Sequence, residues 1–191
     1  MKIALCQINT TLGGFKYNRD LILSNYARSL EMNAELVVFP EMAISGYPAQ
    51  DLLLNSNFIE YNQNSLEIIK NEIGSIPIVI GTILKEDNLL YNSLVVIQNK
   101  EMIYKYHKQK LPNYDIFDEK RYFKSGKKSG VFKINYGALD LTVGLQICED
   151  LWDDDYKAKI SEQQKKSGAE IIINCSASPF TTNKLDKRYF H

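Results

Sequence analysis

Residues 139–152 read LDLTVGLQICEDLW, and this stretch decides how the rest of the sequence is interpreted. Apolar residues occupy every second position from Leu139 to Ile147, a pattern typical of a strand with one buried face. The strand is expected to end at Cys148, where acidic residues follow at once, and a helical segment is expected to begin near Tyr156. Cys148 is therefore predicted to lie on a sharp strand-to-helix turn. Such a turn presents a nucleophile at the top of a sheet and points backbone N–H groups at its target.

Cys148 has two interpretations when it is taken alone. It is either a nucleophile or a small buried apolar residue at the end of a strand, which free cysteines often are. Only the thiolate is a good nucleophile, and the neighbouring carboxylates are expected to raise the thiol pKa above its usual value of about 8.5. The nucleophile therefore needs a base or a cation from elsewhere in the chain. A Cys–His pair would have to use His107 or His191, neither in a strong context, and Cys175 is a less favoured second nucleophile because small residues surround it.

The composition limits the classes of function. The chain has 191 residues, of which 45% are hydrophobic and 24% charged, as in an ordinary globular protein of one or two small domains, with one favoured. The net charge is zero, so no excess charge draws the chain to nucleic acid or to an anionic membrane. Three irregularly spaced cysteines do not form a disulfide framework, which makes the reducing cytoplasm the expected setting. No apolar run approaches the roughly 20 residues of a membrane span, and a strand pattern at the very start predicts no signal peptide.

The hydrophobic pattern predicts strands that alternate with helices in the first half and strands that adjoin directly afterwards. Strands are expected at residues 2–9, 35–39, 76–84, 91–98, 101–106, 131–136 and 170–174, and helices at 18–32, 58–73 and 157–167, with one more from Asn183. Cys6 falls inside the first of these strands and is expected to be an ordinary residue of the hydrophobic core. The strands at 91–98 and 101–106 form a hairpin around Asn99 and Lys100. From the residues alone, this order favours a mixed α/β sheet over a simple Rossmann array.

Three predicted strand ends carry chemically active side chains, and ligands of open α/β sheets bind at such ends. Glu41 follows the strand at 35–39, Lys108 follows the hairpin, and Cys148 ends the central strand. Taken singly, Glu41 is equally well explained as a solvated charge at a strand end, and for Lys108, in a small basic cluster, that explanation is the favoured one. Taken together, they supply a base for the thiol proton and a cation for the thiolate and a later oxyanion. The backbone N–H of Glu149 would be a second oxyanion donor.

Several short strings resemble the three signatures of the nitrilase superfamily. They are FPE at Phe39–Glu41, KQKLPNY at Lys108–Tyr114 and ICED at Ile147–Asp150. The longer strings SGYPAQDLLL, LPNYDIFDEKRYF, QICEDLW and NCSASPF resemble the glutaminase domain of the glutamine-dependent NAD synthetase family, over essentially the whole chain. This resemblance implies an α/β fold of the α-β-β-α sandwich type. It also implies a triad of Glu41 as general base, Lys108 as oxyanion stabiliser and Cys148 as nucleophile.

The resemblance implies further site residues. Glu119 matches a second glutamate that the superfamily places near the lysine and the cysteine, and Tyr114 matches a tyrosine beside the substrate. Glu149, Ser178 and Lys184 match positions that contact the amino-acid end of glutamine. A basic group at Lys184 has a physical purpose there, because it can pair with the α-carboxylate of the substrate.

The implied reaction is hydrolysis of the glutamine side-chain amide through a cysteine thioester. In the full-length family members, the ammonia converts deamido-NAD to NAD. The glutaminase step is expected to need no metal and no cofactor, and ATP and Mg²⁺ are expected only in the synthetase domain. The implied partners are glutamine and, through that domain, deamido-NAD and ATP. The chain is expected to form a homo-oligomer, and it is not expected to bind nucleic acid or a membrane.

Residues 1–191 are expected to form an incomplete domain of this type, without the ATP-dependent synthetase domain. An incomplete sandwich would expose a sheet edge and an apolar face, so poor solubility or oligomerisation and weak or absent glutaminase activity are expected. Two other functions stay open at this point. One is a free-standing carbon–nitrogen hydrolase that acts on a nitrile, an ω-amide or an N-carbamoyl compound. The other is a catalytically inactive interaction module in which Cys148 is simply core.

Overall fold

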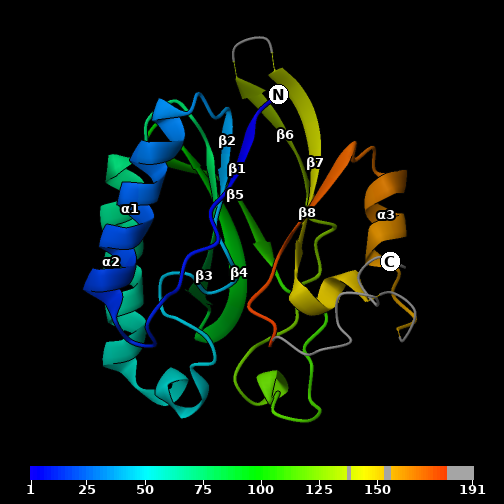
Figure 1. Ribbon diagram of the computed structural model, residues 1–191. Coiled ribbons are helices and arrows are strands. Elements are labelled where there is room, and N and C mark those ends of the chain that lie inside the picture. The colour runs from blue at the N-terminus through cyan, green and yellow to red at the C-terminus, as the bar shows by residue number, and fades with distance from the viewer. Residues whose placement is uncertain (137–138, 153–155, 180–191) are drawn as a thin grey trace.

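The computed structural model describes residues 1–136, 139–152 and 156–179. Two β-sheets face each other between helices (Figure 1). The helices α1 (Phe15–Glu31) and α2 (Ser56–Glu72) cover the outer face of one sheet, and α3 (Ile160–Lys166) lies outside the other. This layering confirms the predicted α-β-β-α sandwich. The single mixed sheet expected from the strand pattern alone was wrong, because that pattern does not say which strands pair.

The strands divide into a five-stranded and a three-stranded sheet. The first sheet has the order β1 (Ile3–Leu5), β2 (Leu36–Val38), β3 (Ile78–Glu86), β4 (Leu89–Gln98) and β5 (Glu101–His107). The second has the order β6 (Val131–Tyr136), β7 (Leu139–Ile147) and β8 (Ile171–Cys175). The β1–β2–β3 and β7–β8 pairs are parallel and the other pairs antiparallel. Short 3-10 helices are η1 (Gln50–Leu54), η2 (Glu119–Arg121) and η3 (Cys148–Leu151).

The predicted hairpin of β4 and β5 is confirmed. Asn99 and Lys100 at its turn have φ angles of 51° and 65°, so both adopt the left-handed conformation of the turns that suit twisted hairpins. Other boundaries differ from the expectations. The first strand ends at Leu5, which leaves Cys6 half-buried beyond it, and α3 begins three residues later than expected. The helix expected from Asn183 lies outside the described residues. Among the described helices, none has the length and apolar character that crossing a membrane requires.

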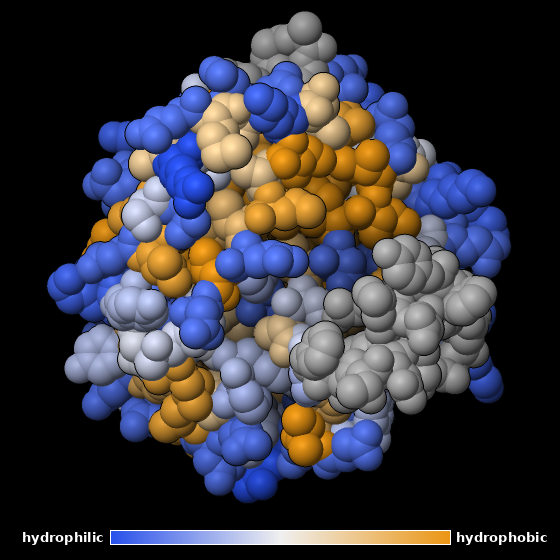
Figure 2. Space-filling model, viewed as in Figure 1, coloured by the Kyte–Doolittle hydropathy of each residue, from blue (hydrophilic) through white to orange (hydrophobic). Residues whose placement is uncertain are grey.

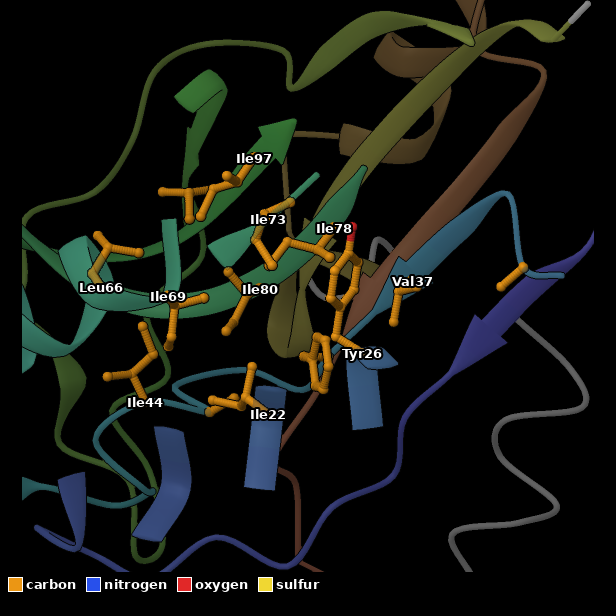
Figure 3. Close-up of a cluster of buried hydrophobic side chains, with 14 residues drawn as sticks. Ile22, Tyr26, Val37, Ile44, Leu66, Ile69, Ile73, Ile78, Ile80 and Ile97 are labelled. Atoms are coloured by element: carbon orange, nitrogen blue, oxygen red, sulfur yellow. The ribbon is translucent and has the colours of Figure 1, made fainter. Parts of the chain in front are cut away.

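Apolar side chains fill both sides of the five-stranded sheet. On one side, residues of α1 and α2 pack against β2, β3 and β4, and Figure 3 shows Ile22, Tyr26 and Ile69 directed at Ile78 and Ile80. On the other side, residues of the two facing sheets pack together. The side chains of this second cluster include Leu36, Val38, Val79, Leu94, Val96, Ile134, Val143, Leu145 and Ile147. The short strand β2 contributes to both clusters, which explains why its sequence is apolar at every position.

A close backbone approach at Gly81 fixes the segment that follows β2. The Gly81 N–H donates to the Pro40 carbonyl oxygen at 3.1 Å. A Cβ at this position would lie 2.3 Å from both the Pro40 oxygen and the Met42 nitrogen, so only glycine fits. This contact holds the residue between them, Glu41, at the end of the strand.

We expect Gly81→Ala to lower the free energy of unfolding by about 1–3 kcal/mol, the usual effect of overpacking a core, because the backbone around Glu41 must move. The measurement is urea denaturation. Gly74→Ala is the matched control, since a Cβ there would meet nothing closer than the Tyr26 hydroxyl at 3.9 Å, and it should change stability by less than about 0.5 kcal/mol. Equal stability of the two variants would contradict the role of this contact.

Candidate active site

The three predicted catalytic side chains meet between the two sheets. Glu41 follows β2, Lys108 follows β5, and Cys148 follows β7 at the first position of η3. Their exposed fractions are 2%, 1% and 8%, so the interpretation of Glu41 and Lys108 as solvated strand ends was wrong. Lys108 Nζ donates to Glu41 Oε1 at 2.8 Å. The predicted base and cation are therefore an ion pair in the interior.

Glu119 is a second carboxylate at Lys108. Lys108 Nζ donates to Glu119 Oε1 at 2.8 Å, and this ion pair is also buried. Burial lowers the pKa of Lys108, but Glu41 and Glu119 outweigh it and hold that pKa well above its usual value. Burial and the charge of Glu41 raise the pKa of Glu119 to about 7 against the opposing effect of Lys108. The lysine therefore stays charged at neutral pH, whereas Glu119 takes up a proton more readily than an exposed glutamate does.

Three donors orient the carboxylate of Glu41. Besides Lys108, Asn92 Nδ2 donates to Oε1 at 2.8 Å, and the backbone N–H of Ala177 donates to Oε2 at 2.9 Å. Asn92 lies on β4, and its backbone carbonyl oxygen accepts a hydrogen bond from the backbone N–H of Lys108 at 2.9 Å. The carboxylate is thus fixed by groups from three separate segments of the chain.

Cys148 has the backbone conformation predicted for a nucleophile on a sharp turn. Its φ angle is 44°, which is uncommon for any residue other than glycine and is typical of functional sites. Burial and the charge of Glu41 raise the thiol pKa to about 12, whereas Lys108 and a hydrogen bond with Ser176 lower it. The pKa is raised, as expected, but chiefly by burial and by Glu41 rather than by the acidic residues that follow in the chain. At neutral pH the thiol therefore keeps its proton until a base removes it.

Two tyrosines hold the side chain of Glu149. The hydroxyl groups of Tyr114 and Tyr156 donate to its two carboxylate oxygens, each at 2.8 Å. Glu149 is buried beside Cys148, whereas Tyr114 is half-exposed at the rim of the site. The predicted substrate residue Tyr114 is therefore joined to the predicted supporting residue Glu149.

A cleft of about 460 Å³ opens next to Cys148. Ser178 lies in its wall, whereas the third predicted substrate residue, Lys184, lies outside the described residues. The remaining walls come from the segments that follow β1, β2 and β8 and from η3. They comprise Leu5, Cys6, Gln7, Val38, Phe39, Pro40, Leu151, Trp152, Asn174, Cys175 and Ser176.

Sequence reasoning missed several partners of the site. Tyr47, in the SGYP string, donates to Glu119 Oε1 at 3.1 Å. Asn92 was predicted only to be part of a strand. An asparagine in an apolar strand indicates a buried amide, which needs a polar partner. Of the other thiol and imidazole candidates, Cys175 lies in the wall of the same cleft, and His191 lies outside the described residues. His107 interacts with Ser93 and Glu86, and Cys175 is buried with its pKa raised by burial.

Comparison with known proteins gives consistent matches. The family described as carbon-nitrogen hydrolase matches residues 2–188. The glutamine-dependent NAD(+) synthetases of Synechocystis sp. and Aquifex aeolicus are each 34% identical over 95% and 96% of this chain, which covers 35% and 31% of those proteins. The structure of the glutamine-dependent NAD+ synthetase from Acinetobacter baumannii superposes with a TM-score of 0.88 at 29% identity, over 97% of this chain and 34% of that one.

An amidase of the nitrilase superfamily from Nesterenkonia shares the fold, with a TM-score of 0.79 at 19% identity over 98% of this chain and 69% of that one. The chain thus spans about a third of the length of the curated relatives named above.

The raised pKa of Cys148 predicts how this thiol reacts with a neutral alkylating agent. We expect its alkylation by iodoacetamide to keep rising up to at least pH 10, because the thiolate fraction grows until the pH reaches the pKa of about 12. Glu41→Gln removes the negative charge that raises this pKa, so it should increase the rate at pH 9 by about tenfold for each unit that the pKa falls.

Mass spectrometry of peptides separates the Cys148 adduct from adducts of Cys6 and Cys175. A plateau in the Cys148 rate near pH 8.5, or a slower reaction in Glu41→Gln, would contradict this account of the thiol.

Proposed function

The chain belongs to the carbon-nitrogen hydrolase family, and from this premise we propose that it hydrolyses the side-chain amide of glutamine. One observation carries the proposal. A lysine that is held charged between Glu41 and Glu119 lies where its charge lowers the pKa of the Cys148 thiol, and that thiol faces a cleft. A base, a fixed cation and a nucleophile in a site largely closed to water are the groups that acyl transfer from an amide requires.

The first step forms a thioester. Glu41 takes the proton of Cys148, and the sulfur attacks the amide carbon. Negative charge then develops on the carbonyl oxygen, where Lys108 and the backbone N–H of Glu149 stabilise it. When the tetrahedral intermediate collapses, the C–N bond breaks and Glu41 passes its proton to the leaving ammonia.

The second step releases glutamate. A water molecule loses a proton to Glu41 and attacks the thioester carbon, and the C–S bond breaks as the sulfur of Cys148 recovers the proton. Glu119 contacts Lys108 rather than the reacting atoms. Its role in the proposal is to hold the ammonium in place through both steps.

We assign the recognition of glutamine to Ser178 in the cleft wall, to Glu149 and Tyr114 beside Cys148, and to Lys184 by the resemblance. The carboxylate of Glu149 suits the α-ammonium of the substrate, and Lys184 suits its α-carboxylate. Ser178 and Tyr114 complete the contacts with the amino-acid end. The positions of Glu149, Tyr114 and Ser178 around Cys148 support this assignment.

The proposed use of the ammonia rests on the relatives, which are named glutamine-dependent NAD(+) synthetases. We propose that residues 1–191 act as the glutaminase domain of such an enzyme. Ammonia would amidate deamido-NAD in a synthetase domain outside these residues, where ATP and Mg²⁺ would bind. Hydrolysis itself would use protein groups alone. The free thiols support a reducing, cytoplasmic setting.

The proposal is tested with a diazo-ketone analogue of glutamine. We expect it to alkylate Cys148 and excess glutamine to block the reaction, because the analogue occupies the glutamine pocket. Intact-mass and peptide mass spectrometry identify the adduct. Cys148→Ser should abolish it, and Cys6→Ser, which changes another thiol of the cleft wall, should keep it. A folded protein without an adduct at Cys148 would refute the proposal.

A parallel assay of ammonia release separates glutamine from other amides. Glutamine should be hydrolysed in preference to a simple amide or a nitrile, and Lys108→Met should lower turnover by about 10²-fold or more, as the loss of an oxyanion donor does. Equal rates with simple amides would favour a free-standing hydrolase instead.

We also propose that the chain forms a homo-oligomer. Leu5 on the edge strand β1 and Ile172 on the edge strand β8 are 71% and 42% exposed. Figure 2 shows apolar residues gathered over this part of the surface. Exposed apolar patches on sheet edges favour association.

Light scattering tests this proposal. The combined change Leu5→Lys and Ile172→Lys should shift the protein toward the monomer by placing charge on both edges. Leu54→Lys is a control, because Leu54 is 69% exposed on η1, and it should leave the mass unchanged. A wild-type monomer at high concentration would contradict the proposal.

A further inference from the structure

Asp150 is a fully buried carboxylate whose role the reaction does not require. It lies on η3, two residues after Cys148, and none of its side chain is exposed. A buried carboxylate is strongly destabilising unless donors satisfy it. Asp150 has four of them, and they come from two separate segments of the chain.

Both carboxylate oxygens of Asp150 bind the segment that carries Lys108. The backbone N–H groups of Gln109 and Lys110 donate to Oδ1 at 3.1 and 2.8 Å. The hydroxyl of Tyr106, on the other side of Lys108 in the chain, donates to Oδ2 at 2.8 Å. The carboxylate is therefore hydrogen-bonded to the chain both before and after Lys108.

The other contact of Asp150 spans the nucleophile. The backbone N–H of Ile147 donates to Oδ2 at 3.1 Å, which closes a small ring around Cys148. The left-handed conformation of Cys148 is unfavourable by itself, and residues in such conformations persist only where their surroundings hold them. Lys110 adds a second link, because its Nζ lies 3.4 and 3.2 Å from the carbonyl oxygens of Asp150 and Trp152.

We propose that Asp150 is a positioning residue that sets the distance between the ammonium of Lys108 and the sulfur of Cys148. The two residues follow strands of different sheets, β5 and β7, so the ladder of neither sheet fixes their separation. The Asp150 carboxylate makes that connection directly. The catalytic part of this inference rests on the proposed function, whereas the geometric part can be tested without substrate.

The test compares two tyrosine variants and one aspartate variant. Asp150→Asn keeps the size of the side chain but places an amide group against at least one of the N–H donors. Tyr106→Phe removes one donor to Asp150 and leaves the other three. Tyr26→Phe is the matched control, because it also deletes a buried hydroxyl, one that is hydrogen-bonded to Ile76 and Gly74 in the cluster between α1 and the sheet.

The first measurement is alkylation of Cys148 by iodoacetamide at pH 9, at a temperature where all variants are folded by circular dichroism. If Asp150→Asn moves Lys108 away, the thiolate loses its cation and the rate falls by about tenfold for each unit that the pKa rises. Loss of the aspartate charge alone would act in the opposite direction, since a lost negative charge favours the thiolate. The direction of the change therefore separates displacement from simple electrostatics.

We expect Tyr106→Phe to slow this alkylation by a smaller factor than Asp150→Asn, and Tyr26→Phe to leave it within about twofold of the wild type at equal folded fraction. Unchanged or faster alkylation in Asp150→Asn overturns the proposal. If that variant does not fold, Tyr106→Phe decides, and equal rates in Tyr106→Phe and Tyr26→Phe overturn it.

The second measurement is glutamine hydrolysis. Asp150→Asn should lower kcat by about 10²-fold with little change in KM, because misplacement of a group that acts only in the transition state has this effect. A wild type that neither hydrolyses glutamine nor reacts with its diazo-ketone analogue rejects the proposed function. The iodoacetamide rates then still decide whether Asp150 positions Lys108.

Discussion

The ammonium of Lys108, held in the interior between two carboxylates, is the contact on which the rest of the site depends. A buried amine without partners would be destabilising by several kcal/mol, and Glu41 and Glu119 at 2.8 Å compensate for its burial. One positive and two potential negative charges leave an excess of negative charge. Burial is the first cause of the raised pKa of Glu119, about 7, and of the raised pKa of the Cys148 thiol, and the excess negative charge adds to it in both cases. The resting site thus combines a paired cation with a neutral thiol.

The charged groups of the site lie at the ends of regular strands. Gly81 lets the segment that carries Glu41 lie against β3, and the β4–β5 hairpin ends directly before Lys108. The turn after β7 brings Cys148 to the same place from the facing sheet. Sites built on rigid elements keep their geometry better than sites on loops, and the proposed acyl transfer would depend on that geometry. The interface between the two sheets is therefore both the second hydrophobic core and the support of the site.

The sequence predicted the strand ends better than the sheets. Apolar runs located β2, β3, β4, β5 and β7 to within a few residues, and the residue types that follow them identified Glu41, Lys108 and Cys148. The same runs suggested one mixed sheet, and they placed Cys6 inside a strand that ends at Leu5. A run of apolar residues indicates that a strand is buried, but it does not indicate which strand pairs with it or which sheet packs against it.

The sequence by itself determined which chemical groups lie at the strand ends. The hydrophobic pattern and the motifs that resemble a known family are both properties of short stretches of consecutive residues. The tertiary structure alone decided that Glu41 accepts from Asn92 and Ala177 and that Asp150 joins the segments of Lys108 and Cys148. It also decided the raised pKa of Cys148, whose chief causes are burial and Glu41. Hydrogen bonds and pKa shifts depend on distances of a few ångströms between residues that are up to 136 positions apart in the chain, and only folding brings such residues together.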